Sequence, residues 1–140
     1  MEQRLFSIEE ANALIPKLEM LMGRLQQHAA ELRSAIEELA VQTGKSAGDL
    51  SAIEIVELRP ALQPVIAELE RLVTEIEECG GQFKGVDLGL VDFPAEINGE
   101  IALLCWQFGE KEIGYWHSLE ADFAGRKRLP APRSRPPYLQ

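Results

Sequence analysis

The chain has few cysteines, few aromatic residues and no long apolar run. Its two cysteines, Cys79 and Cys105, match no disulfide or metal-binding spacing, so we expect reduced thiols in a cytoplasmic protein. No apolar run approaches the roughly 20 residues that a membrane-spanning helix needs, so we expect no membrane association. Residues 1–5 contain no basic segment followed by an apolar run, and we therefore expect no signal peptide.

Basic residues are also scarce, except at one end of the chain. Residues 1–125 hold all 23 acidic residues but only nine of the 14 basic ones, so this part has a net charge of −14. Such a surface repels phosphate groups, and we expect no nucleic acid as the main partner. Residues 126–140 carry a charge of +5 and are expected to form a solvated tail.

The motifs of several common enzyme classes are absent too. The sequence has no Ser-His-Asp order, no phosphate-cradling glycine loop and no dinucleotide fingerprint. It does have 140 residues, 46% of them hydrophobic, which suits one folded domain, residues 1–140, with one main core.

A long helix is predicted over residues 6–42. Ser7 and Glu10 have the pattern of a capping box, in which each side chain accepts a hydrogen bond from the other residue's backbone amide. Apolar residues then recur at alternating steps of four and three, the spacing of a heptad seam. Pro16 removes one backbone donor, so a kink or a restart is expected near it. The seam positions are Leu14, Leu18, Leu21, Leu25, His28, Leu32, Ala35 and Leu39.

A second helix with the same kind of seam is predicted over residues 50–80. Pro60 and Pro64 lie within it, so the helix either begins near Pro60 or bends there, and Gly80-Gly81 is expected to end it. The connecting loop is short, so the two helices should form an antiparallel, coiled-coil-like hairpin. Each apolar stripe is wider than one partner helix covers, so the surplus should pack on a sheet or on another copy of the chain. The second alternative predicts a homodimer or a higher oligomer.

Three strands of an antiparallel β-meander are predicted within residues 86–118. They span residues 86–93, 100–107 and 112–118, which are rich in β-branched and aromatic residues. Asn98-Gly99 is a strong turn dipeptide, Gly109-Glu110 suits a second tight turn, and Pro94 is expected to end the first strand. The predicted fold class is therefore α+β, with the helical hairpin packed on this meander and an extended Pro-rich C-terminal tail at residues 126–140.

Strand register decides which side chains of the meander meet. A two-residue turn at Gly109-Glu110 places Ala102 opposite His117, on the face expected to cover the helices. Asp92 and Cys105 are expected to lie opposite each other on the other face. Under this register Cys105 and His117 cannot share one metal ion, although a loop with an odd number of residues reverses the parity.

Several short motifs along the chain resemble those of one known family. Residues 6–12, followed by Leu14-Ile15-Pro16, resemble a family opening, and residues 123–126 resemble its end. A signature is matched by residues 89–94, 104–106, 109–110 and 115–117. The family is domain-of-unknown-function family 2203, a group of uncharacterised prokaryotic proteins. One departure lies at Ala121-Asp122, where the family tends to have an acidic residue followed by a small one. The resemblance implies a fold and a site but carries no activity.

Residues 89–126 hold most of the side chains that can bind or titrate. Arg126 with Asp92 or Glu110 can form a buried ion pair or grip an anionic ligand. Both tryptophans can line a pocket, although aromatic residues at strand spacing more often belong to a core. The candidate ligand-binding residues are Asp92, Glu110, Trp116, His117 and Arg126.

His117 is the only histidine in this block, and the carboxylates of Glu110 and Glu120 lie near it in sequence. These three residues form a candidate site for a divalent ion such as zinc, or for an acid and a base. The alternative is a half-buried histidine that is hydrogen-bonded to a carboxylate as a structural latch. Cys105 lies between apolar residues, so we expect an inert core thiol rather than a nucleophile.

Two classes of function follow from these patterns. The first is a small binding or assembly module that oligomerises through its helical seams and whose tail docks on a neighbouring subunit or another partner. The second is a metal-dependent ligand-binding protein, or a small hydrolase-like enzyme, with a carboxylate-histidine site. We favour the first class because the seams are long and the acid-base set matches no known mechanism.

Overall fold

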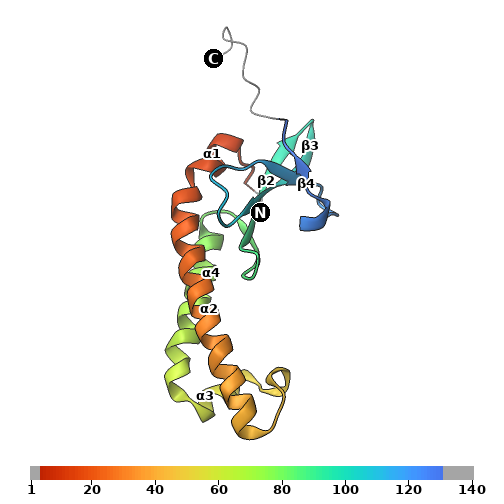
Figure 1. Ribbon diagram of the computed structural model, residues 1–140. Helices are drawn as coiled ribbons and strands as arrows, with labels where there is room; N and C mark the ends of the chain where they lie inside the picture. The colour runs from red at the N-terminus through yellow and green to blue at the C-terminus, as the bar shows by residue number, and fades with distance from the viewer. Residues whose placement is uncertain (1–3, 131–140) are drawn as a thin grey trace.

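The computed structural model describes residues 4–130, which form a long helical hairpin with an antiparallel sheet at one end (Figure 1). The α+β class is confirmed. The sheet has five strands in the order β1-β2-β3-β4-β5, so the prediction of three strands is wrong. The two additional strands are the edges, β1 (Gln82–Gly85) and β5 (Lys127–Arg128). Predictions for residues 131–140 of the tail lie outside the described residues.

The predicted first helix is two helices, α1 (Ile8–Ala13) and α2 (Ile15–Thr43). The predicted capping box is present: the Ser7 hydroxyl accepts from the Glu10 amide at 3.0 Å, and the Glu10 carboxylate accepts from the Ser7 amide at 2.9 Å. Leu14 separates the helices, and Pro16 lies in the first turn of α2, where a missing amide donor costs nothing. The expected restart near Pro16 is therefore confirmed.

Prolines also divide the second arm of the hairpin. After the short helical turn η1 (Ala47–Asp49), the arm contains α3 (Ala52–Leu58), the turn η2 (Pro60–Leu62) and α4 (Gln63–Glu78). Arg59 breaks the helix before Pro60, and Pro64 falls in the first turn of α4. The arm ends at Gly80, whose positive φ of 101° suits glycine. Within residues 4–130, no helix combines the length and the apolar character that a membrane crossing requires.

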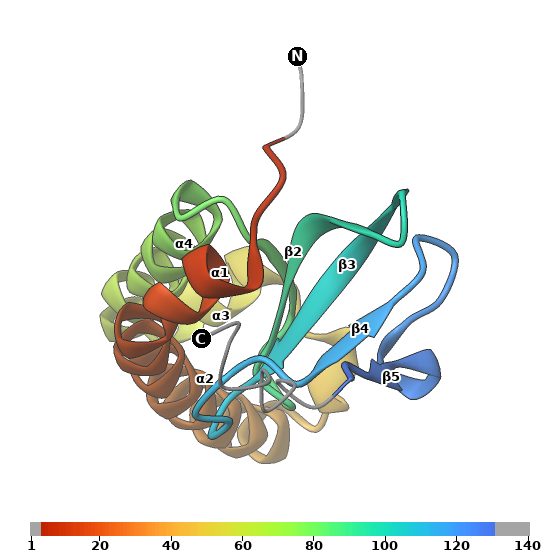
Figure 2. The same cartoon turned by 90° about the horizontal axis from the view of Figure 1, so that it is seen from above.

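The hairpin has a different environment at each end. Near the sheet, α1, α2 and α4 lie over one sheet face (Figure 2), and their apolar residues pack with Phe93 and Trp106 in the main core. Farther along, beyond the reach of the sheet, a second cluster joins the helices alone. Five of the eight predicted seam positions of the first helix are buried: Leu18, Leu21, Leu25, Ala35 and Leu39.

The two central strands follow the sequence prediction in part. β3 (Glu100–Gln107) has the predicted bounds, and Asn98 and Gly99 form the turn before it with φ of 54° and 82°. β2 (Leu90–Ile97) continues through Pro94, so the prediction that this proline ends the strand is wrong. The Pro94 carbonyl accepts from the Phe6 amide at 2.7 Å. The carbonyl and the nitrogen of one residue face the same edge of a strand. The Pro94 nitrogen, which has no hydrogen to donate, therefore faces away from β3, and no hydrogen bond between β2 and β3 is lost.

The predicted register between β3 and β4 (Tyr115–His117) is wrong by one residue. Leu103, not Ala102, lies opposite His117. Residues 108–114, an odd number, connect the two strands in place of a two-residue turn. A shift of one residue moves every side chain of a strand to the other face. His117 therefore shares a face with Asp92 and Cys105, and Trp116 faces the helices.

Candidate metal centre

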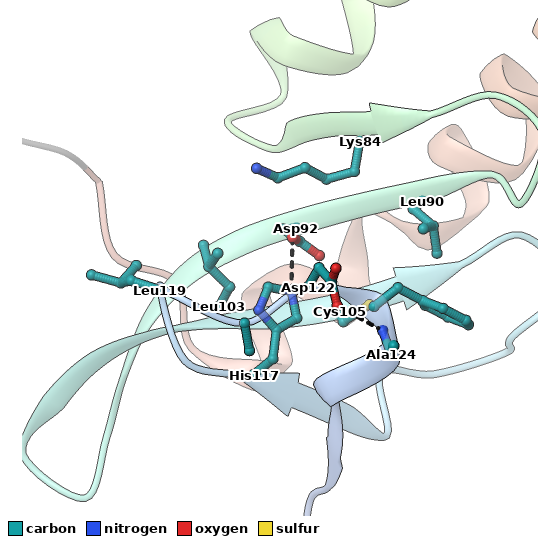
Figure 3. Close-up of a pocket in the computed structure, with 11 residues that line it drawn as sticks. Lys84, Leu90, Asp92, Leu103, Cys105, His117, Leu119, Asp122 and Ala124 are labelled. Atoms are coloured by element: carbon teal, nitrogen blue, oxygen red, sulfur yellow. Dashed lines mark hydrogen bonds and ion pairs between the residues drawn. The ribbon is translucent and has the colours of Figure 1, made fainter.

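Three buried side chains on neighbouring strands converge on the sheet face away from the helices. Asp92 comes from β2, Cys105 from β3 and His117 from β4, and their exposed fractions are 2%, 1% and 3%. Each offers one possible metal-ligand atom: a carboxylate oxygen, the thiol sulfur and an imidazole nitrogen. These three atoms lie within 4.8 Å of one another. Figure 3 shows the three side chains grouped together on the sheet. Oxygen, sulfur and nitrogen donors are all ligands that zinc accepts.

The histidine ring is held in one orientation. Its Nδ1 lies 2.9 Å from the Ser118 carbonyl oxygen, which can only accept, so Nδ1 carries a hydrogen. Its Nε2 lies 2.9 Å from the Asp92 carboxylate. A neutral ring of this tautomer turns a lone pair toward a carboxylate, which is unfavourable unless a proton or a cation lies between them. A backbone carbonyl that orients the second nitrogen is also the usual outer partner of a metal-binding histidine.

The Asp92 carboxylate is incompletely satisfied. Only Oδ2 contacts His117, whereas Oδ1 is buried and has no hydrogen-bond partner among residues 4–130. A buried carboxylate oxygen without a partner costs free energy, so it calls for a ligand or an ion nearby.

The thiol of Cys105 is poorly ionised by itself. Burial, together with the charge of Asp92, raises its pKa to about 12, although Arg126 partly opposes both effects. Cys105 is therefore no nucleophile at neutral pH, because the thiolate is the reactive form. A bound divalent cation reverses this situation because it stabilises the thiolate directly.

Arg126 lies beside Cys105 and is held there by contacts with a carboxylate and two aromatic rings. One guanidinium nitrogen lies 3.9 Å from the Cys105 sulfur and 3.4 Å from the Glu110 carboxylate. The guanidinium also stacks on the rings of Tyr115 at 3.9 Å and Phe123 at 4.5 Å. Of the two carboxylates predicted as its partners, Arg126 contacts Glu110 and not Asp92, and its positive charge lies beside the sulfur.

A pocket of about 400 Å³ opens over the three side chains. The segment after β4, which includes the helical turn η3 (Phe123–Gly125), forms one side of it. Lys84 of β1 and Asp122 bring the only further charged side chains that line the pocket among residues 4–130. Its volume lies in the range of small-molecule sites.

The residues predicted from the sequence fall in different places. Asp92 and His117 are together, but Glu110 contacts Arg126 rather than His117, and Glu120 is exposed outside the cluster. Trp116 packs partly against the main core and does not line this pocket. The predicted metal set therefore shares only His117 with the observed cluster.

Residues 4–129 match the family described as "Uncharacterized conserved protein (DUF2203)". The chain belongs to this family. No curated protein and no solved structure matches the chain. All three residues of the cluster lie inside the stretch that matches DUF2203, as do Arg126 and Glu110.

The sequence did not predict that Cys105 lies beside His117 in this DUF2203 protein. Asp92 and Cys105 were correctly placed opposite each other, and the structure pairs them in β2 and β3. The difference arises at the turn: Gly109-Glu110 suits a two-residue hairpin, but residues 108–114 connect the strands. The alternation of Cys105 with Leu104 and Trp106 carries the useful signal, since it puts Cys105 on the face away from the core.

Proposed function

We propose that the protein binds one divalent transition-metal ion through Asp92, Cys105 and His117 and presents its open coordination position to the pocket. The convergence of three different donor atoms within 4.8 Å on rigid, neighbouring strands carries this proposal. Donors of a tetrahedral zinc ion lie roughly 3–4 Å apart, so small side-chain rotations bring the cluster to that geometry. A carboxylate and a thiolate also balance the charge of a divalent ion.

Zinc matches this set of ligands best. Thiolate favours zinc over magnesium, calcium or manganese, and imidazole suits zinc as well. Structural zinc sites use four protein ligands, whereas sites with three leave a position for water or a ligand. A three-ligand set beneath a pocket therefore favours a metal-dependent ligand-binding role over a purely structural one.

A structural latch between His117 and Asp92 is the competing explanation. It accounts for their 2.9 Å contact but leaves the second Asp92 oxygen without a partner. It also leaves the Cys105 thiol with no more than a weak hydrogen bond to Asp92. A metal ion explains all three side chains at once.

Metal content tests the proposal directly. Untagged protein purified without chelator is expected to contain about one equivalent of zinc per chain, the stoichiometry of a mononuclear site. Replacement by cobalt should produce a thiolate-to-cobalt charge-transfer absorption, because Cys105 is a ligand. Substoichiometric metal, together with no cobalt absorption and no thermal stabilisation by zinc, would leave the latch as the explanation.

Self-association through the helices is a second candidate role, and it does not compete with metal binding. Beyond the sheet, the half-buried residues Leu32, Ile36 and Leu69 line an open groove of about 280 Å³ on the hairpin. Packing against a second copy would cover this groove.

The expected result is a dimer in analytical ultracentrifugation at roughly tens of micromolar protein. Ile36→Glu should shift the protein toward monomer because it places a charge in the groove. The exposed residue Glu31, which lies on the same helix but does not line the groove, serves as the control when changed to glutamine. A monomer at all concentrations would contradict the assembly role and leave the metal proposal intact.

A further inference from the structure

The walls of the pocket above the metal cluster are largely apolar. Leu90 and Leu103 lie on the sheet side, and Leu119, Ala121 and Phe123 lie on the segment that follows β4. Leu119 is 57% exposed, which is unusual for a large apolar side chain. An apolar group bound in the pocket would contact these walls and cover Leu119.

Lys84 supplies a positive charge on one side of the pocket. It is the only lysine or arginine among residues 4–130 that lines the pocket, and it has no ion pair within that part of the chain. Figure 3 shows its side chain running along the Asp92 side of the pocket. An amine without a counterion beside a metal position favours an anionic ligand.

The opposite charge, on Asp122, is already engaged. Its Oδ1 accepts a hydrogen bond from the Ala124 amide at 3.1 Å and caps the turn η3. A cationic ligand would be attracted by Asp122 but repelled by the metal ion and by Lys84. An ammonium group also has no lone pair with which to coordinate a metal ion, whereas a carboxylate is a good zinc ligand.

We infer that the ligand of this pocket is a small organic carboxylate with a short apolar chain. Its carboxylate binds the open position of the metal ion and faces Lys84, and its chain lies against Leu119 and Phe123. This inference rests on the metal site proposed above, because the carboxylate needs the ion as its main partner.

The test uses the full chain loaded with cobalt, and hexanoate as the probe. Hexanoate is expected to change the cobalt absorption spectrum saturably, whereas hexanol and hexylamine should bind at least about tenfold more weakly. Acetate should also bind more weakly than hexanoate, since it cannot reach the apolar walls. Leu119→Ser should reduce that difference between hexanoate and acetate.

Lys84→Met should weaken hexanoate binding about fivefold, the effect of losing a partly exposed ion pair, without changing the metal content. Lys111→Met, at an exposed lysine that does not line the pocket, is the matched control and should change neither property. Stoichiometric metal with a spectrum insensitive to hexanoate would overturn the inference and spare the metal site. Tighter binding of hexylamine would also overturn it. Failure to bind any metal would overturn both proposals.

Discussion

Cys105→Ser is expected to weaken zinc binding by at least about a hundredfold, more than is usual for the loss of an outer-shell partner. Serine keeps the size of the side chain but replaces a thiolate with a neutral hydroxyl, which removes one charged donor from the site. His117→Gln and Asp92→Asn should have effects of similar size, because each also removes one ligand of three. Competition titration of chelator-treated protein against a zinc indicator measures the change.

Two matched variants make this prediction specific. Cys79→Ser alters the other thiol, which lies at the end of α4 outside the cluster, and Glu120→Gln alters an exposed carboxylate close to His117 in sequence. Both should bind zinc as the unmodified protein does. A loss of affinity in Glu120→Gln equal to that in Asp92→Asn would instead support the ligand set predicted from the sequence.

Stability provides an independent measurement on the same variants. A ligand that binds only the folded state stabilises it by about 2.7 kcal/mol when present at 100 times its dissociation constant. The unmodified protein should therefore unfold at a clearly higher temperature with zinc than with chelator. Cys105→Ser should show little of this difference at the same zinc concentration.

Trp106→Ala is expected to lower the free energy of unfolding by about 3–5 kcal/mol, the cost of removing a large aromatic side chain from a packed core. Trp106 is fully buried. Its indole nitrogen donates to the Glu110 carbonyl at 3.0 Å, and its ring meets Phe108 edge to face at 6.4 Å between centroids. Urea denaturation followed by far-ultraviolet circular dichroism measures the loss.

Trp116→Ala is the matched comparison. Trp116 is only partly buried, and the amine of the exposed residue Lys127 lies over its ring at 5.2 Å from the centroid. Its removal leaves a smaller cavity, so the loss of stability should be less than half that of Trp106→Ala. Equal losses would contradict the assignment of Trp106 to the main core and of Trp116 to its margin.

The helices were predictable because their signals are local. The capping box at Ser7 acts within four residues, and the seam repeats within two turns, so neither depends on distant parts of the chain. The outer strands β1 and β5 were not predictable in this way. They are short, and β5 exists only because Lys127 and Arg128 pair with β4.

In the candidate site, too, one feature was predictable from local signals and another was not. The pairing of Asp92 with Cys105 followed from the turn at Asn98-Gly99, which joins their two strands directly. The position of His117 beside Asp92 and Cys105 did not follow from any local signal. It depends on the long loop between β3 and β4, whose length the dipeptide Gly109-Glu110 suggested wrongly.

By itself, the sequence determined the α+β class, the helix starts and the apolar seams, because hydrogen bonds and side-chain periodicity act over a few residues. Only the tertiary structure decided the register of His117. The Gly109 amide donates to Glu19 at 3.1 Å and the Ile113 amide donates to Asn12 at 2.7 Å, so two helices about 90 to 100 positions earlier hold this loop open. The loop that they hold has an odd number of residues between the paired strands. That parity brings His117 to Asp92 and Cys105.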